Sequence, residues 1–189
     1  MMEAIRTILG TLQPSTQARD EEGLERDGHT VLYVGAENWP FPVPLVAQGN
    51  AWRFDTAAGE QAILFRRIGE NERTAIEICR ELAAAARHSQ AHQDDDFLGK
   101  LLADASHAGA TPAQYRGYRF RVLNPGSKNF AAIAYPAAYR SSGVVTFIVG
   151  REGVVHAKDL GSSSAEAANA MTGYRSDRSW TREPDPGER

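Results

Sequence analysis

The chain has 189 residues, a net charge of −3 at pH 7 and 42% hydrophobic residues. This length and composition suit one compact domain or two small ones. The near-neutral charge, without a basic run, argues against binding to nucleic-acid phosphates. No apolar run approaches the ~20 residues of a membrane-spanning helix, and the single cysteine, Cys79, excludes an internal disulfide. We expect no nucleic-acid partner, no membrane span and no cofactor.

The N-terminal part of the chain predicts short elements separated by turns. Residues 1–12 have the apolar spacing of a short helix. His29–Gly35 is rich in β-branched and aromatic residues, as is typical of a strand. Trp39–Pro44 contains three prolines, which lack a backbone N–H, so this segment should be extended at a sheet edge or outside a sheet. Ala51–Thr56 predicts a second strand.

Two helical segments follow. Ala57–Gly69 predicts one helix, and Asn71–Gln90 predicts a longer one with Asn71 as its N-cap. A second helix of about twenty residues would span about 30 Å, enough to cross a small sheet. Its apolar residues recur at spacings of three and four and therefore share one face: Ile76, Cys79, Leu82, Ala83 and Ala86.

The last third of the chain predicts antiparallel strands. Its apolar-rich segments, one of them with a clear period-two pattern, are separated by short turns: 117–123, 129–136, 144–150 and 154–158. We therefore predict an α+β fold in which the long central helix packs on a C-terminal antiparallel four-stranded sheet. A small N-terminal α+β unit precedes it, with domains at 1–66 and 67–189.

Several stretches resemble a bacterial family of uncharacterised secreted proteins, catalogued as domain of unknown function 2950. They include ENWPFPVPLV, WRFDTAAGEQAILFRRIGENERTAIEICR, GYRFRVL and AYPAAYRSSGVVTFIVGREGVVHAKDLG, and they cover most of Trp39 to Thr181. The C-terminal half also resembles the soluble domain of type IV pilins and pseudopilins, in which an NE-x-x-AI helix precedes a GYRF strand. The family resemblance implies a periplasmic or extracellular location. The first residues lack the features of a signal peptide, so the chain alone predicts the cytoplasm.

Aromatic and charged residues of the N-terminal unit form one candidate site. Trp39, Phe41 and Trp52 can line a groove for a peptide or sugar. Four charged residues can serve as polar partners at its rim: Arg53, Asp55, Arg66 and Arg67. The alternative, which we favour, is an aromatic cluster that seals the core of this unit, with the charged residues in surface ion pairs.

A second candidate is a metal site. His88 and His92 are spaced i,i+4 near the predicted helix end, and Asp94, Asp95 and Asp96 follow. Two imidazoles on one helix face with a carboxylate can bind a divalent metal. A solvated helix end explains the same residues, because cationic side chains interact favourably with the helix dipole there. We favour the solvated helix end and predict no metal.

Catalytic candidates are weaker. Ser142, His156 and Asp159 are the residue types of a hydrolase triad, but no nucleophile-elbow pattern surrounds Ser142. Cys79 lies on the apolar helix face, where thiols are usually inert.

A basic strip is the last candidate surface. Arg119, Arg121 and Arg140 can form it on the exposed face of the sheet, either as a contact for an acidic partner or as ordinary surface charge.

The leading functional hypothesis is a non-catalytic, envelope-associated interaction or scaffold protein whose partner is a protein or peptide. Its contact surface would be the Trp–Pro segment or the open face of the sheet. The alternative is a hydrolase or small-ligand-binding protein with a pocket at the junction of the two units, near Trp39, Trp52, Asp55 and His88.

Overall fold

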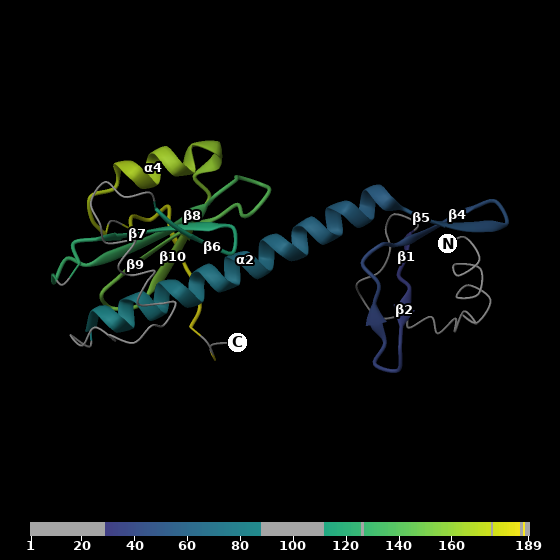
Figure 1. The fold of residues 1–189 in the computed structure, drawn as a ribbon, viewed down its shortest axis with the longest axis horizontal. Coiled ribbons are helices and arrows are strands. Elements are labelled where there is room, and N and C mark those ends of the chain that lie inside the picture. The colour runs from purple at the N-terminus through teal and green to yellow at the C-terminus, as the bar shows by residue number, and fades with distance from the viewer. Residues whose placement is uncertain (1–28, 88–111, 126, 175, 186, 188–189) are drawn as a thin grey trace. The chain divides into compact units, whose positions relative to one another are not determined.

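A computed structural model describes residues 29–87, 112–125, 127–174, 176–185 and 187 of the chain (Figure 1). The chain forms two compact units, the first ending at Thr56 and the second beginning at Ala57. The sequence pattern puts this boundary later, at residue 66. The helix predicted for residues 1–12 lies outside the described residues. Each unit is described by itself.

The described part of the first unit contains five short strands. They are β1 (His29–Thr30), β2 (Tyr33–Val34), β3 (Trp39–Pro40), β4 (Leu45–Gln48) and β5 (Ala51–Phe54). β1, β4 and β5 form an antiparallel sheet in the order β1-β4-β5, and β2 pairs with β3 in a separate antiparallel ribbon. The β4–β5 hairpin turns at Gly49, whose φ of 63° lies in the left-handed region that a two-residue turn requires.

One helix replaces the two predicted ones. α2 (Thr56–Arg87) runs for 32 residues and continues through Gly69. Asn71 therefore caps no helix, and its side-chain amide donates instead to the carbonyl of Ser142 at 2.8 Å. An interior glycine costs about 1 kcal/mol relative to alanine, which packing elsewhere along a helix can offset. The buried helix residues are Gly59, Ile68, Ala75, Ile78, Cys79, Leu82 and Ala83.

The second unit is built on a six-stranded antiparallel sheet. Its strands are β6 (Ala113–Tyr115), β7 (Tyr118–Leu123), β8 (Ala131–Pro136), β9 (Thr146–Gly150), β10 (Val155–Lys158) and β11 (Thr181–Arg182). Their order is β11-β10-β9-β8-β7-β6. A turn of 3₁₀ helix, η1 (Gly161–Ser163), leads into α4 (Ser164–Ala170), and Figure 1 shows α4 and α2 on opposite sides of this sheet.

Both faces of the six-stranded sheet bury apolar side chains. On one face, Leu82 and Cys79 of α2 belong to a buried cluster with Tyr118, Phe120 and Phe147. On the other face, a smaller cluster contains Ile133, Tyr135, Ile148 and Ala168 of α4. Every residue of β8 is consequently buried.

The predicted fold class is wrong. The described residues form three antiparallel sheets, and the largest has six strands rather than four. β6 and β11 are the additional strands, and with three and two residues they are too short to show a period-two pattern. The prediction also left one sheet face open, whereas α4 packs on that face.

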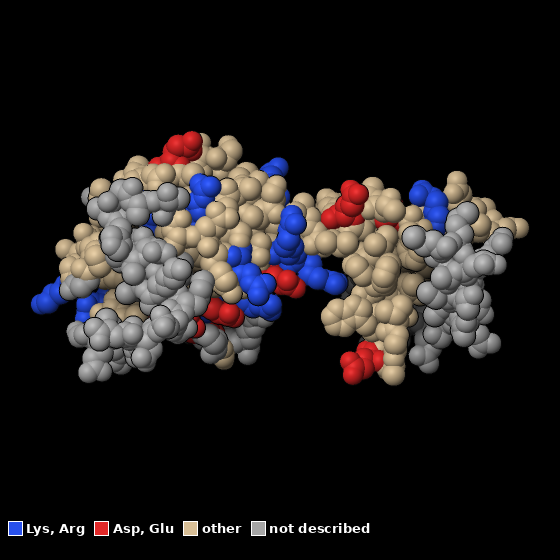
Figure 2. Space-filling model, viewed as in Figure 1, with Lys and Arg blue, Asp and Glu red and all other residues tan. Residues whose placement is uncertain are grey.

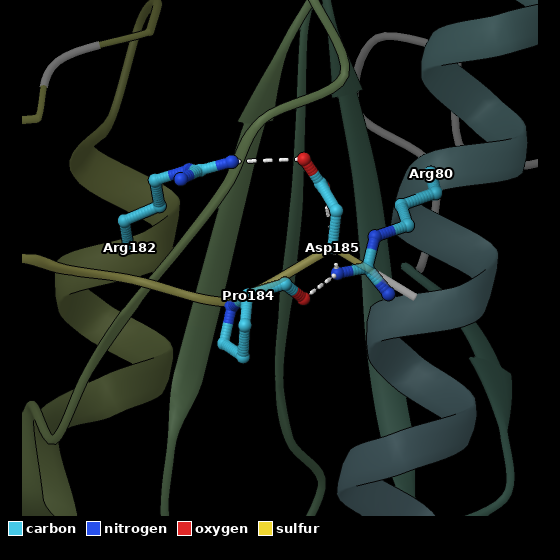
Figure 3. A network of polar contacts seen from close by, with 4 residues as sticks. All are labelled: Arg80, Arg182, Pro184 and Asp185. Atoms are coloured by element: carbon cyan, nitrogen blue, oxygen red, sulfur yellow. Dashed lines mark hydrogen bonds and ion pairs between the residues drawn. The ribbon is translucent and has the colours of Figure 1, made fainter. Parts of the chain in front are cut away.

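The C-terminal segment is held against α2 by a polar network (Figure 3). Arg80 of α2 donates to the backbone carbonyl of Pro184 at 2.6 Å, and its guanidinium lies 3.9 Å from Asp185 Oδ1. Arg182 of β11 donates to Asp185 Oδ2 at 2.8 Å. Together with the pairing of β11 on β10, these contacts hold the C-terminal segment at one edge of the sheet.

A carboxylate of α2 holds the loop before β9. Glu72 Oε1 accepts hydrogen bonds from the backbone N–H groups of Val144 at 2.9 Å and Val145 at 3.2 Å. The Tyr118 hydroxyl donates to the carbonyl of Val145 at 2.8 Å and lies 3.4 Å from Glu72 Oε1. Burial, reinforced by Glu72, raises the pKa of Tyr118 above its ordinary value.

Candidate functional site

The first unit exposes large apolar side chains. We call this group the exposed apolar set; its members are Val31, Tyr33, Trp39, Phe41, Trp52 and Phe54. Trp39 and Trp52 are each 60% exposed. In the face shown in Figure 2, the described part of this unit, where Figure 1 labels β1 and β2, has few charged residues. Large exposed apolar residues gathered on a small unit are typical of a contact surface.

The three aromatic residues named for the groove, Trp39, Phe41 and Trp52, each have a different neighbour in the structure. Phe41 packs against Phe54, with ring centroids 5.6 Å apart, a contact that the sequence analysis missed. Trp39 lies opposite Val34 in the β2–β3 ribbon. Trp52 lies opposite Ala47 on β5, the last strand of its sheet. A groove that joins Trp39 and Trp52 remains a prediction.

Two of the charged residues named for the groove rim, Asp55 and Arg53, differ in their surroundings. Asp55 Oδ2 lies 3.0 Å from His29 Nε2, and both side chains are partly buried, at 25% and 32% exposure. This pair joins the strand that opens the described chain to the segment before α2. Arg53 lies opposite Val46 and is exposed. His29 was missed because a contact across 26 residues leaves no local pattern.

A pocket of about 590 Å³ lies in the second unit. Three segments line it: the turn between β7 and β8, the turn between β9 and β10, and the residues after α4. Gly150, the last residue of β9, forms part of its wall, and a Cβ placed there would lie 3.4 Å from the ring of Tyr174. The ring of Tyr174 therefore lies directly against this part of the sheet.

A chain of polar groups runs along the pocket wall. His156 and Tyr174 both line the pocket, and His156 Nδ1 lies 2.8 Å from the Tyr174 hydroxyl. The Ser176 hydroxyl donates to the Tyr174 oxygen at 3.1 Å. When Tyr174 in turn donates to Nδ1, the neutral imidazole carries its proton on Nε2, which is then a hydrogen-bond donor.

The three residues that the sequence analysis weighed as a weak triad candidate do not form a triad. Ser142 Oγ donates to the carbonyl of Ala138 at 3.1 Å. Asp159 accepts hydrogen bonds from the Gly161 N–H at 2.7 Å and from the Tyr139 hydroxyl at 3.1 Å. His156 interacts with Tyr174. Each member thus has its own partner, and the nucleophile–base–acid chain that triad chemistry requires is not formed.

The histidine pair and the single cysteine are two further candidates from the sequence. His88 and His92 lie outside the described residues. Within the described segments, no group of three or more His, Cys, Asp or Glu side chains is placed to hold a metal ion. Cys79 is fully buried, and burial raises the pKa of its thiol to about 12, so the reactive thiolate is disfavoured.

The predicted basic strip lies partly under α4. Arg119 and Arg121 are half-buried, and Arg121 donates to the carbonyl of Ala168 at the end of α4. Both guanidiniums lie near Tyr135, where burial raises the pKa of the hydroxyl and the two cations partly oppose this rise. Arg140 stacks over the ring of Tyr139. Two of the three cations therefore stabilise the fold rather than form an open surface.

The family match covers nearly the whole chain. Residues 6–97 and 87–182 match the family described as protein of unknown function, DUF2950. The chain belongs to this family. The match confirms the family resemblance seen in the sequence.

No curated protein and no solved structure matches the chain significantly. The resemblance to type IV pilins is therefore unsupported. Within the described residues, no helix combines the length and apolar character needed to cross a bilayer.

Proposed function

We propose that this DUF2950 protein is a non-catalytic interaction or scaffold protein that binds an extended peptide segment of a partner protein through its first unit. The observation that carries the proposal is the exposed apolar set, above all the two tryptophans at 60% exposure. An envelope location is part of the proposal and rests on the resemblance to secreted proteins.

The edge strand β5 supports an extended partner. In the order β1-β4-β5, β5 pairs only with β4 among the described strands, and all four of its residues are exposed. The outer edge of such a strand offers backbone N–H and C=O groups to an added strand. Because alternate side chains of a strand share a face, Trp52 and Phe54 would contact the same side of the bound peptide.

The residue types support a protein partner. Tryptophan and tyrosine dominate binding energy at protein interfaces because they bury a large area and lose few rotatable bonds. Tyr33, Trp39 and Trp52 supply three such residues, and each is more than half exposed. A hydrolase receives no comparable support, because Ser142, His156 and Asp159 have separate partners.

A peptide selection tests the proposal. Phage-displayed peptides would be selected on the full chain, and the affinity of the selected peptide would be measured by titration calorimetry. We expect Trp52→Ala to weaken binding by about tenfold or more, as at an interface hot spot. Phe65→Ala is the matched control, because Phe65 on α2 is also an exposed aromatic, at 62%.

The control should change the affinity by less than about twofold, since such a small change is what a residue outside the interface produces. Equal losses in Trp52→Ala and Phe65→Ala would show non-specific apolar adhesion and overturn the proposal. A selection that yields no binding peptide would also overturn it.

A further inference from the structure

We propose that the pocket of the second unit binds a small organic oxyanion, a metabolite-sized molecule that carries a carboxylate or phosphate group together with hydroxyl groups. This site is separate from the peptide-binding surface proposed for the first unit. The proposal rests on the volume of the pocket, the charges at its rim and the hydrogen bonds that hold its walls.

The volume and the wall contacts suit a small ligand. About 590 Å³ lies within the 300–1,000 Å³ range of small-molecule sites. The Asn124 side-chain amide donates to the carbonyls of Asn129 at 3.2 Å and Thr172 at 3.3 Å. It thereby ties the β7–β8 turn to the segment after α4, so two of the three walls are joined before a ligand arrives.

The third wall is held in the same way. Arg151 donates through Nη1 to the carbonyl of Ser127 at 3.3 Å, which joins the β9–β10 turn to the β7–β8 turn. The carbonyl of Arg151 accepts a hydrogen bond from Arg87 of α2 at 3.0 Å. A site whose walls are joined loses little entropy when it binds a ligand.

The charges favour an anion. Among the described residues that line the pocket, Lys128 and Arg151 are cationic and Glu152 is the one carboxylate, so two cations accompany one anion. Lys128 is exposed, whereas Arg151 is half-buried and keeps further N–H donors beyond the one directed at Ser127. Charge-assisted hydrogen bonds from these groups are stronger than neutral ones.

Neutral groups of the wall suit hydroxyl groups of the same ligand. Asn129 and Thr172 line the pocket and are exposed. His156 adds an Nε2 donor when its Nδ1 accepts from Tyr174, and the ring of Tyr174 supplies an apolar wall. A hydroxylated carbon skeleton next to an oxyanion would use both kinds of group.

A matched series of hexoses tests the proposal. The full ¹⁵N-labelled chain would be titrated with glucose 6-phosphate, glucuronate, glucose and inorganic phosphate. We expect the amide signals of Gly150, Gly173 and Arg151 to shift with at least one of the two charged hexoses. Glucose alone should bind at least about tenfold more weakly, the usual effect of losing one charge-assisted hydrogen bond. A response to glucose 6-phosphate alone would show that the pocket takes a phosphate, and a response to glucuronate alone would show that it takes a carboxylate.

Two variants locate the charge contact. Lys128→Gln should weaken binding of the responding hexose by about tenfold, since it removes one cation without altering a buried side chain. Arg66→Gln removes an exposed cation of α2 outside the pocket and should leave the affinity unchanged. The proposal is overturned if neither charged hexose shifts the three amides, if glucose binds as tightly, or if both variants lose the same affinity.

Discussion

In the second unit, Tyr118, Phe120 and Phe147 are at most 2% exposed, whereas in the first unit Trp39 and Trp52 are each 60% exposed. The difference follows from strand length. Strands of four to six residues, such as β7 to β10, present two or three side chains to each face and can bury them under a helix. In the described part of the first unit, three of the five strands have only two residues, so each of these presents a single side chain to each face.

Large apolar residues in the two units therefore have different roles: those of the second unit stabilise the fold, and those of the first unit are available for contact. Leu82 and Phe120 lie in one buried cluster, so they contribute to the stability of the second unit. Trp52 is 60% exposed, so its apolar area is available for contact with a partner. Three predictions test this division, from the largest expected effect to the smallest.

The largest effect is expected in the buried cluster. Leu82→Ala should lower the free energy of unfolding by about 2–5 kcal/mol, because Leu82 is fully buried and its truncation leaves a cavity. Trp52→Ala should change this free energy by less than about 0.5 kcal/mol, as is usual for exposed positions. Urea unfolding followed by far-UV circular dichroism measures both. A cost for Trp52→Ala equal to that of Leu82→Ala would abolish the distinction between the units.

The second prediction concerns close packing in the second unit. A Cβ on Gly143 would lie 2.3 Å from the Tyr118 hydroxyl oxygen and 2.5 Å from its ring. Because Tyr118 is fully buried and cannot move aside, Gly143→Ala should cost about 1–3 kcal/mol.

The matched control for this substitution is Gly69→Ala on α2. A Cβ on Gly69 would meet nothing within 4 Å, so the alanine should stabilise the helix by about 0.5–1 kcal/mol. The same urea titration measures both variants, and opposite signs are expected. A destabilisation of similar size in both would show that close packing around Tyr118 is not the cause.

The third prediction is a dependence on alkaline pH. The pKa of Tyr118 is raised in the folded protein, so folding favours its neutral form. Its contribution is fully present below the ordinary tyrosine pKa of about 10 and is lost as the pH rises above that value. One such group lowers the free energy of unfolding by up to about 1.4 kcal/mol per pH unit. Cys79 adds a further loss of stability at lower pH, in the range between the ordinary thiol pKa and its raised pKa of about 12.

Tyr118→Phe isolates the tyrosine contribution. Above about pH 10, the free energy of unfolding of this variant should fall less steeply than that of the unaltered protein. Cys79→Ala should leave the tyrosine part of the slope in place. Identical slopes in the unaltered protein and in Tyr118→Phe would show that Tyr118 has the same pKa in both states, against its burial.

Local patterns in the sequence located several elements. The strand-like segments of the C-terminal third coincide with β7 to β10, and the three-and-four spacing places Cys79, Leu82 and Ala83 on the buried face of α2. These patterns are visible because each depends on neighbours within a few residues. The turn at Gly49 is equally local, since it depends on the conformational freedom of one residue.

Other features left no local pattern. β11 is recognisable as a strand only because it pairs with β10. The sequence between residues 162 and 171 does suggest a short helix, but the packing of α4 on a sheet face that the alternation of β7 suggested was open depends on tertiary contacts. The sequence predicted a helix start at Asn71, but α2 continues through Gly69 and Asn71. The Asn71 side chain donates instead to the carbonyl of Ser142, 71 residues away. Tertiary contacts overrode local propensity at each of these places.

The candidate sites divide in the same way. Composition and spacing named Trp39, Phe41 and Trp52, because clustered aromatic residues and prolines are conspicuous along the chain. Residue spacing could not reveal the pocket, whose walls come from two turns and the segment after α4, which are far apart in the sequence. Periodicity depends on neighbouring residues, so it shows which face of a helix or strand is apolar. A pocket or a covered sheet face forms only when segments that are distant in the sequence pack together, because the hydrogen bonds and the burial between them are determined by the whole fold.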